Sequence, residues 1–392
     1  MVEIGDDEFG NRVGKLCFSY YDKLVKTGKP QKGKEWTHFA AILVTKQKDD
    51  GDQDLEIVSM ATGTKCVGIS GRNMNGYVLH DSHAEVLARR AFLRYLYFEI
   101  CQAARYDSSD VLNYSRLTGT CSLKPNVNFH MFVSHTPCGD ASIFPKTPAT
   151  DNEIGIVIDD DGNNDTSDPK PKRQKLHTTN DQDVEDIQRT GAKCLPTGPQ
   201  DLHLPGVNYH ITKLIRLKPG RGEPTRSLSC SDKIAKCPFS KTALHRAIIE
   251  RIKDVSNLPP DYRVNTPDLV QSTCVFADGR FTTSLTNVLP CPSGTVIWSA
   301  VPETSIEVTV QGKKQGVTKK AGLTDKAACS VCKKKLLDQF HVTRLTINKL
   351  KSESLKLENQ RTYYDWKTSA VYYQKAKTQL QNAMKDWPPS LS

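Results

Sequence analysis

The sequence contains no run of about 18 apolar residues, so no segment is expected to span a membrane as a helix. The first eight residues, Met1 to Glu8, are acidic and lack the apolar stretch of a secretory signal peptide. The chain nevertheless has 12 cysteines, and without such a signal they favour metal binding or burial over a disulfide framework. These absences argue against a secreted or membrane protein and indicate a reducing, intracellular compartment, the nucleus or the cytoplasm.

A formal net charge of +10 over 392 residues favours a polyanionic partner. The excess is uneven, because residues 313–377 are basic whereas residues 151–168 are acidic. A solvated surface rich in lysine explains the same charge without any partner. The length is ample for a buried core, and we expect a single domain over residues 1–392.

The spacing of apolar residues predicts a layered α/β fold, in which strands and helices alternate along the first part of the chain. Helical spacing appears at 9–27 and again after His83, and a second helix is expected to begin after Cys138. The other predicted elements are strands at 39–44, 55–60, 127–134 and 207–217, two strands within 294–310, and helices at 242–254, 322–340 and 360–386.

Residues 146–194 interrupt this pattern. They combine an acidic run, Asp159 to Asp165, with a basic run, Pro169 to Lys175, and their low hydrophobicity predicts a disordered insertion within the domain. The basic run matches a nuclear import signal, and a solvated linker accounts for it equally well.

A polar segment, D-S-H-A-E at 81–85, leads into the helix predicted after residue 83. Asp81 and Ser82 are residue types that cap helix N-termini, which places His83 and Glu85 in the first turn. At a helix start, both side chains can reach one small object over the N-terminus. The imidazole would then bind a metal ion, and the carboxylate would reach its water.

A cysteine motif, T-P-C-G-D-A at 136–141, contains Cys138. Zinc deaminases of bases and nucleosides carry H-x-E followed by P-C-x-x-C, with the glutamate as proton shuttle. Ala141 stands at the position of their second cysteine, so the two motifs supply only two of the three protein ligands of a catalytic zinc site. Cys230, in the polar stretch S-C-S-D-K, is the best source of a third ligand, and Cys237 is a nearby alternative.

The motifs H-A-E, P-C-G-D-A and S-C-S-D-K, in this order, resemble those of the RNA adenosine deaminase family. The resemblance covers most of the chain outside the insertion. It implies a three-layer, cytidine-deaminase-like α/β sheet flanked by helices, with an added C-terminal helical part. It also implies a zinc ion held by His83, Cys138 and Cys230, with Glu85 as the catalytic residue in the hydrolysis of adenosine to inosine.

Only about 35 residues precede the first predicted strand, too few for a dedicated double-stranded-RNA-binding domain like those of the family's editing enzymes. The bare catalytic unit, with K-P-G-R-G at 218–222, resembles the branch of the family that acts on tRNA. This implies a monomer whose substrate is the adenosine immediately 3′ of the anticodon, typically in alanine tRNA. Thr64 and Lys65 are expected to contact the target ribose and backbone. Arg221 lies where the editing relatives fill the space of the flipped base, and a phosphate-contacting turn is its alternative role.

The C-terminal stretch 360–386 interleaves aromatic residues with lysines. An RNA-binding face and a packed face with exposed lysines both fit this pattern. The family resemblance implies a third explanation, inositol hexakisphosphate enclosed in the core, because so many cations cannot be buried together without a polyanion. The matching positions are Arg89, Arg90, Lys233, Lys236, Lys333 (with Lys334 and Lys335 adjoining), Lys367, Tyr373, Gln374, Lys377 and Trp387, with Asp81 and Lys233 connecting them to the zinc ligands.

Other functions stay open on the residues alone. A cytidine deaminase shares the metal chemistry, but Ala141 replaces a cysteine that such enzymes usually keep. Deamination of another RNA is a further alternative. A catalytically inactive protein that binds RNA or inositol phosphate would have no need of Glu85, which is present. The lone C-S-V-C at 329–332 is attributed to the predicted helix rather than to a zinc knuckle.

Overall fold

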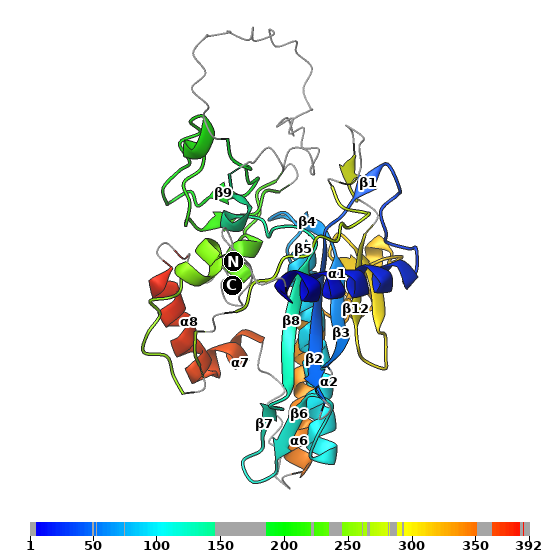
Figure 1. Ribbon diagram of the computed structural model, residues 1–392. Helices are drawn as coiled ribbons and strands as arrows, with labels where there is room; N and C mark the ends of the chain where they lie inside the picture. The colour runs from blue at the N-terminus through cyan, green and yellow to red at the C-terminus, as the bar shows by residue number, and fades with distance from the viewer. Residues whose placement is uncertain are drawn as a thin grey trace, which may run out of the picture.

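A six-stranded sheet with helices on both faces forms the centre of the computed structural model (Figure 1). The strand order is β14-β13-β12-β3-β2-β8, and each neighbouring pair is antiparallel. Within the described part of the chain, no helix is both long enough and apolar enough to cross a bilayer. The structure describes residues 5–48, 51, 53–73, 75–145, 186–220, 223–234, 245–260, 262–264, 267–280, 282, 288–291, 294–350, 363–384 and 387.

The layered α/β prediction and the added C-terminal helices are confirmed. The central strands are β2 (Phe39–Gln47), β3 (Gln53–Thr62), β8 (Val127–Val133), β12 (Thr295–Ser299), β13 (Ile306–Val310) and β14 (Lys313–Lys314). The helices are α1 (Gly5–Lys23), α2 (Ala84–Tyr106), α4 (Cys230–Ile234), α6 (Lys333–Leu350), α7 (Tyr363–Ser369) and α8 (Val371–Ala383). Short strand pairs are β1 (Glu35–Trp36) with β11 (Leu289–Pro290), β4 (Thr64–Cys66) with β5 (Asp81–His83), β6 (Leu112–Ser115) with β7 (Thr120–Leu123), and β9 (Lys193–Cys194) with β10 (Arg216–Leu217).

Side chains of β2 alternate between two hydrophobic layers, as expected for a strand that is buried on both faces. Phe39 and Leu43 pack with residues of α1, whereas Ala40 and Val44 pack with residues of α2. In Figure 1, α1 crosses one face of the sheet, and α2 and α6 lie behind it. The helix–sheet–helix arrangement therefore follows from the period of two in β2.

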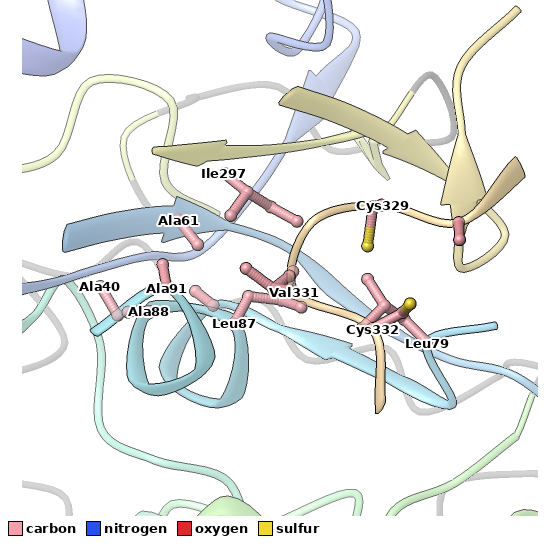
Figure 2. Packing of buried hydrophobic residues seen from close by; sticks show 12 residues of the cluster. Ala40, Ala61, Leu79, Leu87, Ala88, Ala91, Ile297, Cys329, Val331 and Cys332 are labelled. Atoms are coloured by element: carbon pink, nitrogen blue, oxygen red, sulfur yellow. The ribbon is translucent and has the colours of Figure 1, made fainter. Parts of the chain in front are cut away.

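Small residues let α2 approach the sheet closely. Ala88 and Ala91 are fully buried and face the strands together with Leu87 (Figure 2). Two strand hydroxyls also satisfy helix carbonyl groups: Ser59 donates to the carbonyl of Ala88 at 3.0 Å, and Ser299 donates to that of Ala91 at 2.9 Å. Close packing of apolar atoms and paired buried polar groups together fix α2 on the sheet.

Two C-terminal helix predictions need correction. The helix predicted over 322–340 begins only at Lys333, and Cys329 and Cys332 lie in the segment before it. Both cysteines are fully buried in the core cluster that also contains Leu87 of α2 (Figure 2). Tertiary packing therefore overrides the helical conformation that the apolar spacing predicted. The single helix predicted over 360–386 is interrupted at Ala370, which separates α7 from α8.

The middle of the chain is less regular than predicted. The strand predicted over 207–217 is reduced to β10, because its partner β9 is only two residues long. The helix predicted over 242–254 appears as one π-helical turn, His245–Glu250, and residues 242–244 lie outside the described residues. Of the insertion predicted at 146–194, residues 186–194 are described and 146–185 lie outside the described residues.

Replacing the fully buried Leu87 by alanine should lower the free energy of unfolding by about 2–5 kcal/mol, because a cavity forms between α2 and the sheet. Leu117, which is 96% exposed, provides the matched control, and its alanine variant should change stability by less than about 0.5 kcal/mol. Urea denaturation measures both. Equal losses for the two variants would contradict the assignment of this core.

Candidate active site

His83 lies at the junction between the β4–β5 hairpin and the long helix α2. The N-cap of α2 is His83 itself, not Asp81 or Ser82 as predicted, because pairing with β4 keeps the chain extended through His83. The Asp81 carboxylate accepts the backbone N–H of His83 at 3.1 Å. Helix α2 begins at Ala84, so Glu85 lies in the first turn, as predicted.

Cys138 and Cys230 are brought to the His83 imidazole from 55 and 147 residues away. The Cys138 Sγ lies 3.9 Å from Nδ1 of His83, and the Cys230 Sγ lies 3.6 Å from the same atom. The two cysteines also meet directly, since the backbone N–H of Cys230 donates to Sγ of Cys138 at 3.3 Å. The three residues that sequence motifs singled out are therefore adjacent in space.

The helix predicted after Cys138 is wrong, because only one 3-10 turn, Asp140–Ser142, follows it. Gly139 has a φ of 105°, and a Cβ atom there would lie 2.3 Å from the Ser229 hydroxyl. Its backbone N–H donates to the hydroxyl of Thr190 at 3.1 Å. Side chains from distant segments thus satisfy this turn in place of helical hydrogen bonds, and only glycine fits the contact.

The donor set of Nδ1 and two thiols fits a zinc ion. These atoms lie within 4.8 Å of one another, and a tetrahedral zinc with ordinary bond lengths separates nitrogen and sulfur ligands by about 3.6 Å. A second possible group, Cys66 with Asp81 and His83, overlaps the first. Asp81 is already bound to two ammonium groups, so the set with Cys138 and Cys230 fits better.

Lys218 favours the thiolate form of both cysteines. Hydrogen bonding with Cys230 holds the pKa of the Cys138 thiol well below its ordinary value, and Lys218 lowers that pKa further. Burial raises the pKa of the Cys230 thiol well above its ordinary value, and Lys218 opposes this. The two shifts have opposite signs because adjoining buried thiols do not ionise together unless more positive charge is present. A metal cation would supply that charge.

The carboxyl group of Glu85 is buried next to these residues. Within the described residues its Oε2 atom has no hydrogen bond, although the atom is inaccessible to solvent. Burial raises the pKa of the Glu85 carboxyl above its ordinary value. A buried carboxyl that holds a proton more readily than usual suits a group that accepts a proton and returns it.

Asp81 forms the centre of a buried ionic network. The Lys218 Nζ donates to both of its carboxylate oxygens at 2.8 and 3.0 Å, the Ser227 hydroxyl donates at 2.7 Å, and Lys233 donates as well. Burial raises the pKa of Asp81, but the two ammonium groups outweigh burial and hold it well below its ordinary value. Conversely, Asp81 and the nearby cysteines raise the pKa of Lys218 despite its burial. Both groups are therefore charged, as paired buried ions should be.

The sequence assigned no role to Lys218 beyond its place in the K-P-G-R-G stretch at 218–222. The side chain is in fact fully buried, and so is that of Arg216 two residues earlier. Alternation of these two basic residues with Leu217 is a strand pattern with its charged face turned inward. This pattern could be interpreted only after the structure showed the buried carboxylates of Asp201 and Asp81 that pair with the two basic side chains.

Arg216 belongs to a second buried network that supports the cysteine turn. Its guanidinium forms two hydrogen bonds with the carboxylate of Asp201, at 2.6 and 2.7 Å. His210 joins Nδ1 to Asp201 at 2.9 Å and accepts the backbone N–H of Thr190 at 3.2 Å through Nε2. Because the Thr190 hydroxyl holds Gly139, the network reaches the residue beside Cys138.

Cations carried by α2, α6, α7 and α8 lie close enough together to influence one another and form a cluster. Burial and the charges of Arg90, Arg72 and Lys367 lower the pKa of Lys333, while burial and Lys367 lower that of Lys377. The Arg90 Nε donates to a backbone carbonyl at 2.6 Å, but its Nη2 is buried without a partner among the described residues. Repelling cations with an unpartnered donor fit a polyanionic ligand. Arg72, which the sequence did not suggest, is part of this cluster.

Of the other predicted phosphate-binding residues, some lie at this cluster and some do not. Tyr373 lies below Lys367, whose Nζ is 5.7 Å from its ring centroid, and the Gln374 side chain donates to the Lys367 carbonyl at 2.5 Å. Arg89 is exposed on α2. Trp387 packs against an apolar cluster that contains Met384.

The predicted RNA contacts are described only in part. Thr64 and Lys65 are half-buried in β4, opposite His83 and Ser82 of β5. Arg221, and Lys236 of the predicted phosphate site, lie outside the described residues, so their roles stay predictions.

The sequence profile of the adenosine-deaminase (editase) domain matches residues 59–238 and 234–388. The chain therefore belongs to the adenosine-deaminase (editase) family and is a hydrolytic deaminase. It is 32% identical to tRNA-specific adenosine deaminase 1 of Homo sapiens over 94% of this chain and 95% of the human protein. It is 33% identical to the Drosophila melanogaster protein of the same name over 84% of this chain. Double-stranded RNA-specific editase Adar of Drosophila melanogaster is 28% identical over 79% of this chain and 45% of its own length.

Removing one partner of the Asp201–Arg216 pair should be strongly destabilising, because a buried charge is left uncompensated. Arg216→Met is expected to lower the free energy of unfolding by about 3–5 kcal/mol. Arg116→Met is the matched control, since Arg116 pairs with Asp107 on the surface, where the side chains are 67% and 53% exposed. The control should change stability far less, and chemical denaturation compares the two. Comparable losses would show that the buried network does not support the fold.

Proposed function

We propose that this chain hydrolyses adenosine to inosine in tRNA, and that its target is the adenosine immediately 3′ of the anticodon in alanine tRNA. The observation that carries the proposal is the meeting of His83, Cys138 and Cys230 beside Glu85, whose buried Oε2 atom has no partner among the described residues. Similarity over nearly the whole length of proteins named tRNA-specific adenosine deaminase 1 supports tRNA as the substrate.

His83, Cys138 and Cys230 are the residues that would hold zinc, through one imidazole nitrogen and two thiolates. When bound, the ion lowers the pKa of a water molecule towards neutrality. Lys218 contributes by favouring the thiolates, and Asp81 holds the backbone of His83 in place. The residues of this chain thus set the ligand charge and the orientation of the imidazole.

Glu85 transfers the protons of the reaction. Its carboxylate accepts one proton from the attacking water and delivers it to N1 of adenine, and it then moves the proton that remains on the new C6 hydroxyl to the departing ammonia. Burial favours the protonated form, so the carboxyl can retain a proton between the two transfers. Water adds at C6 and ammonia leaves, and inosine is the product.

A tRNA loop presents its bases to a deaminase with little base pairing to open. A base in such a loop is unpaired or easily splayed, which reduces the cost of turning it into the site. Thr64 and Lys65 would contact the target ribose and backbone, and Arg221 would occupy the space of the displaced base or bind a phosphate. We propose that the enzyme acts as a monomer in the nucleus, the cytoplasm or both.

Inositol hexakisphosphate is the proposed ligand of the cation cluster. The unpartnered Nη2 of Arg90 and the mutual repulsion among Lys333, Lys367 and Lys377 support this ligand. Lys233, which is bound to Asp81, would connect the phosphate ligand to the zinc ligands. Arg89, Lys236, Tyr373, Gln374 and Trp387 complete the proposed set.

Glu85→Ala should reduce conversion of adenosine by at least about 10²–10⁴-fold, because the proton carrier is lost. Zinc content should be unchanged, because Glu85 is not among the proposed ligands. Sequencing of total tRNA after incubation reads inosine, and elemental analysis reads zinc. Glu56→Ala, at a glutamate whose side chain is 54% exposed, should match the wild type.

Three outcomes of the same assay would contradict the proposal. Appreciable turnover by Glu85→Ala removes the residue from its role. Conversion of cytidine in place of adenosine indicates a cytidine deaminase. Binding of RNA without any conversion by the wild type indicates a protein without catalytic activity.

Protein purified in its native state should release inositol hexakisphosphate on denaturation, in near-equimolar amount by mass spectrometry. Lys333→Gln should reduce that amount and lower the melting temperature, because the ligand stabilises the folded state only when bound. Lys326→Gln, at an exposed lysine, is the control and should retain the ligand. Absence of any inositol phosphate in the wild type would overturn this assignment.

A further inference from the structure

Two histidines that no proposed role uses lie beside the zinc ligands. His38 precedes the first residue of β2, and His135 follows β8 by two residues. The two strands pair antiparallel, so these positions fall at the same edge of the sheet. The carbonyl of His38 accepts the backbone N–H of Gly63, one residue before β4, at 3.0 Å. His135 is three residues before Cys138.

Burial determines the charge state of the two histidines. It lowers the pKa of both, to about 4 for His135. The charges of His135 and His83 lower the pKa of His38 further, whereas at His135 the charge of Arg280 adds to the effect of burial and that of Cys138 opposes it. The two imidazoles are therefore uncharged at neutral pH.

The two rings form a parallel stack. Their centroids are 5.0 Å apart and their planes are inclined by only 3°. Trp36 contacts this pair edge to face, since its ring centroid is 5.0 Å from that of His38 at an interplanar angle of 68°. The guanidinium of Arg280 lies 5.7 Å from the Trp36 ring centroid. Three aromatic rings and one cation thus form a continuous group, called here the Trp36 cluster.

The Trp36 cluster leads outward from the site. His38, His135 and Trp36 are half-buried, whereas Arg280 is exposed. Among the described residues, the groups with metal-ligand geometry contain neither His38 nor His135. Single-stranded RNA is bound by aromatic rings that stack on bases, histidine included, and by cations beside the backbone. The cluster has both components in one place.

We propose that the Trp36 cluster is a binding subsite for the nucleotide that adjoins the target adenosine in the substrate RNA. Its base stacks against the rings of the cluster, and its phosphate lies near Arg280. The outward course of the cluster favours the neighbouring nucleotide over the target itself, which must lie at Glu85. This subsite rests on the proposed function, since it requires an RNA substrate.

The test separates ring stacking from other roles. His38 and His135 are each changed to Asn, which removes the ring, and to Phe, which keeps it. The exposed His245, outside the cluster, is changed to Asn as the control. The probe is an anticodon stem-loop RNA with 2-aminopurine on either side of the target adenosine, and zinc content is measured in parallel.

Loss of one stacked base corresponds to about a 5- to 160-fold change in affinity. His38→Asn and His135→Asn should raise Kd and KM by this factor, with kcat and zinc content within about twofold of the wild type. The fluorescence change of the neighbouring 2-aminopurine should disappear in both variants. The Phe variants and His245→Asn should remain near the wild type. Arg280→Gln should weaken binding and reduce its salt dependence by about one phosphate contact.

Asn variants that bind the RNA as tightly as the wild type would overturn the subsite. So would a fall in kcat or zinc content shared by the Asn and Phe variants, because that pattern marks support of the metal site. If the Asn variants do not fold, the exposed Arg280→Gln decides, and unchanged affinity and salt dependence refute the subsite. RNA binding is measured without turnover, so it tests the subsite even if the wild type converts no adenosine. Failure of the wild type to convert adenosine would refute the proposed function and leave the subsite to be decided by binding.

Discussion

Bringing two thiols from distant segments against one imidazole is the constraint on which the rest of this structure depends. The residues that meet Nδ1 of His83 lie 55 and 147 residues away in the chain. Two buried networks maintain the contact. The Arg216 network reaches the turn after Cys138 through Thr190, and the Arg216 backbone N–H also donates to Asp232, within α4, at 2.9 Å. Both cysteines are thus linked to Arg216. The side chain of Arg216 supports the turn next to Cys138, and its backbone N–H supports the helix that contains Cys230.

The interior contains buried charge of two kinds, and the difference is functional. Asp81 faces the ammonium groups of Lys218 and Lys233, and Asp201 faces the guanidinium of Arg216, so burial of each anion is compensated within the chain. Around Lys333 the neighbouring charges are those of Arg90, Arg72 and Lys367, and these groups repel one another. Paired buried ions need no further partner in the folded chain, whereas a group of cations that repel one another favours the binding of an external anion. Lys233 is bound to the Asp81 carboxylate, which also holds the backbone of His83, a proposed zinc ligand.

Helix α2 sets the positions of both sites. Its first residues place Glu85 beside the cysteines, and Arg90 lies one and a half turns further along the same helix. Ala88 and Ala91 let this helix contact the sheet closely, and the serine hydroxyls of β3 and β12 fix its position along the strands. The small apolar side chains on one face of α2 therefore determine the positions of Glu85 and Arg90 on the same helix.

Local patterns in the sequence were sufficient to predict the elements of the central sheet. The alternation in β2 and the helical spacing of α2 depend on nearest neighbours, and both elements formed where expected. Residue chemistry likewise indicated His83, Glu85, Cys138 and Cys230, because imidazole, carboxylate and thiol in familiar motifs have few other uses together. Family resemblance contributed the proposed phosphate-binding residues, which the spacing of apolar residues does not encode.

Tertiary structure alone decided where regular structure fails and which charges are buried. The turn at Gly139 replaced a predicted helix because Ser229 and Thr190, far along the chain, occupy the space and the hydrogen bonds that a helix would need. Cys329 and Cys332 are not helical as predicted, because both side chains pack in the core against α2. In the sequence, Lys218 cannot be told from a surface lysine. In the fold its Nζ is buried 2.8 Å from the carboxylate of Asp81. A sequence specifies side-chain chemistry and local conformation, whereas desolvation and charge pairing depend on residues that only the fold brings together.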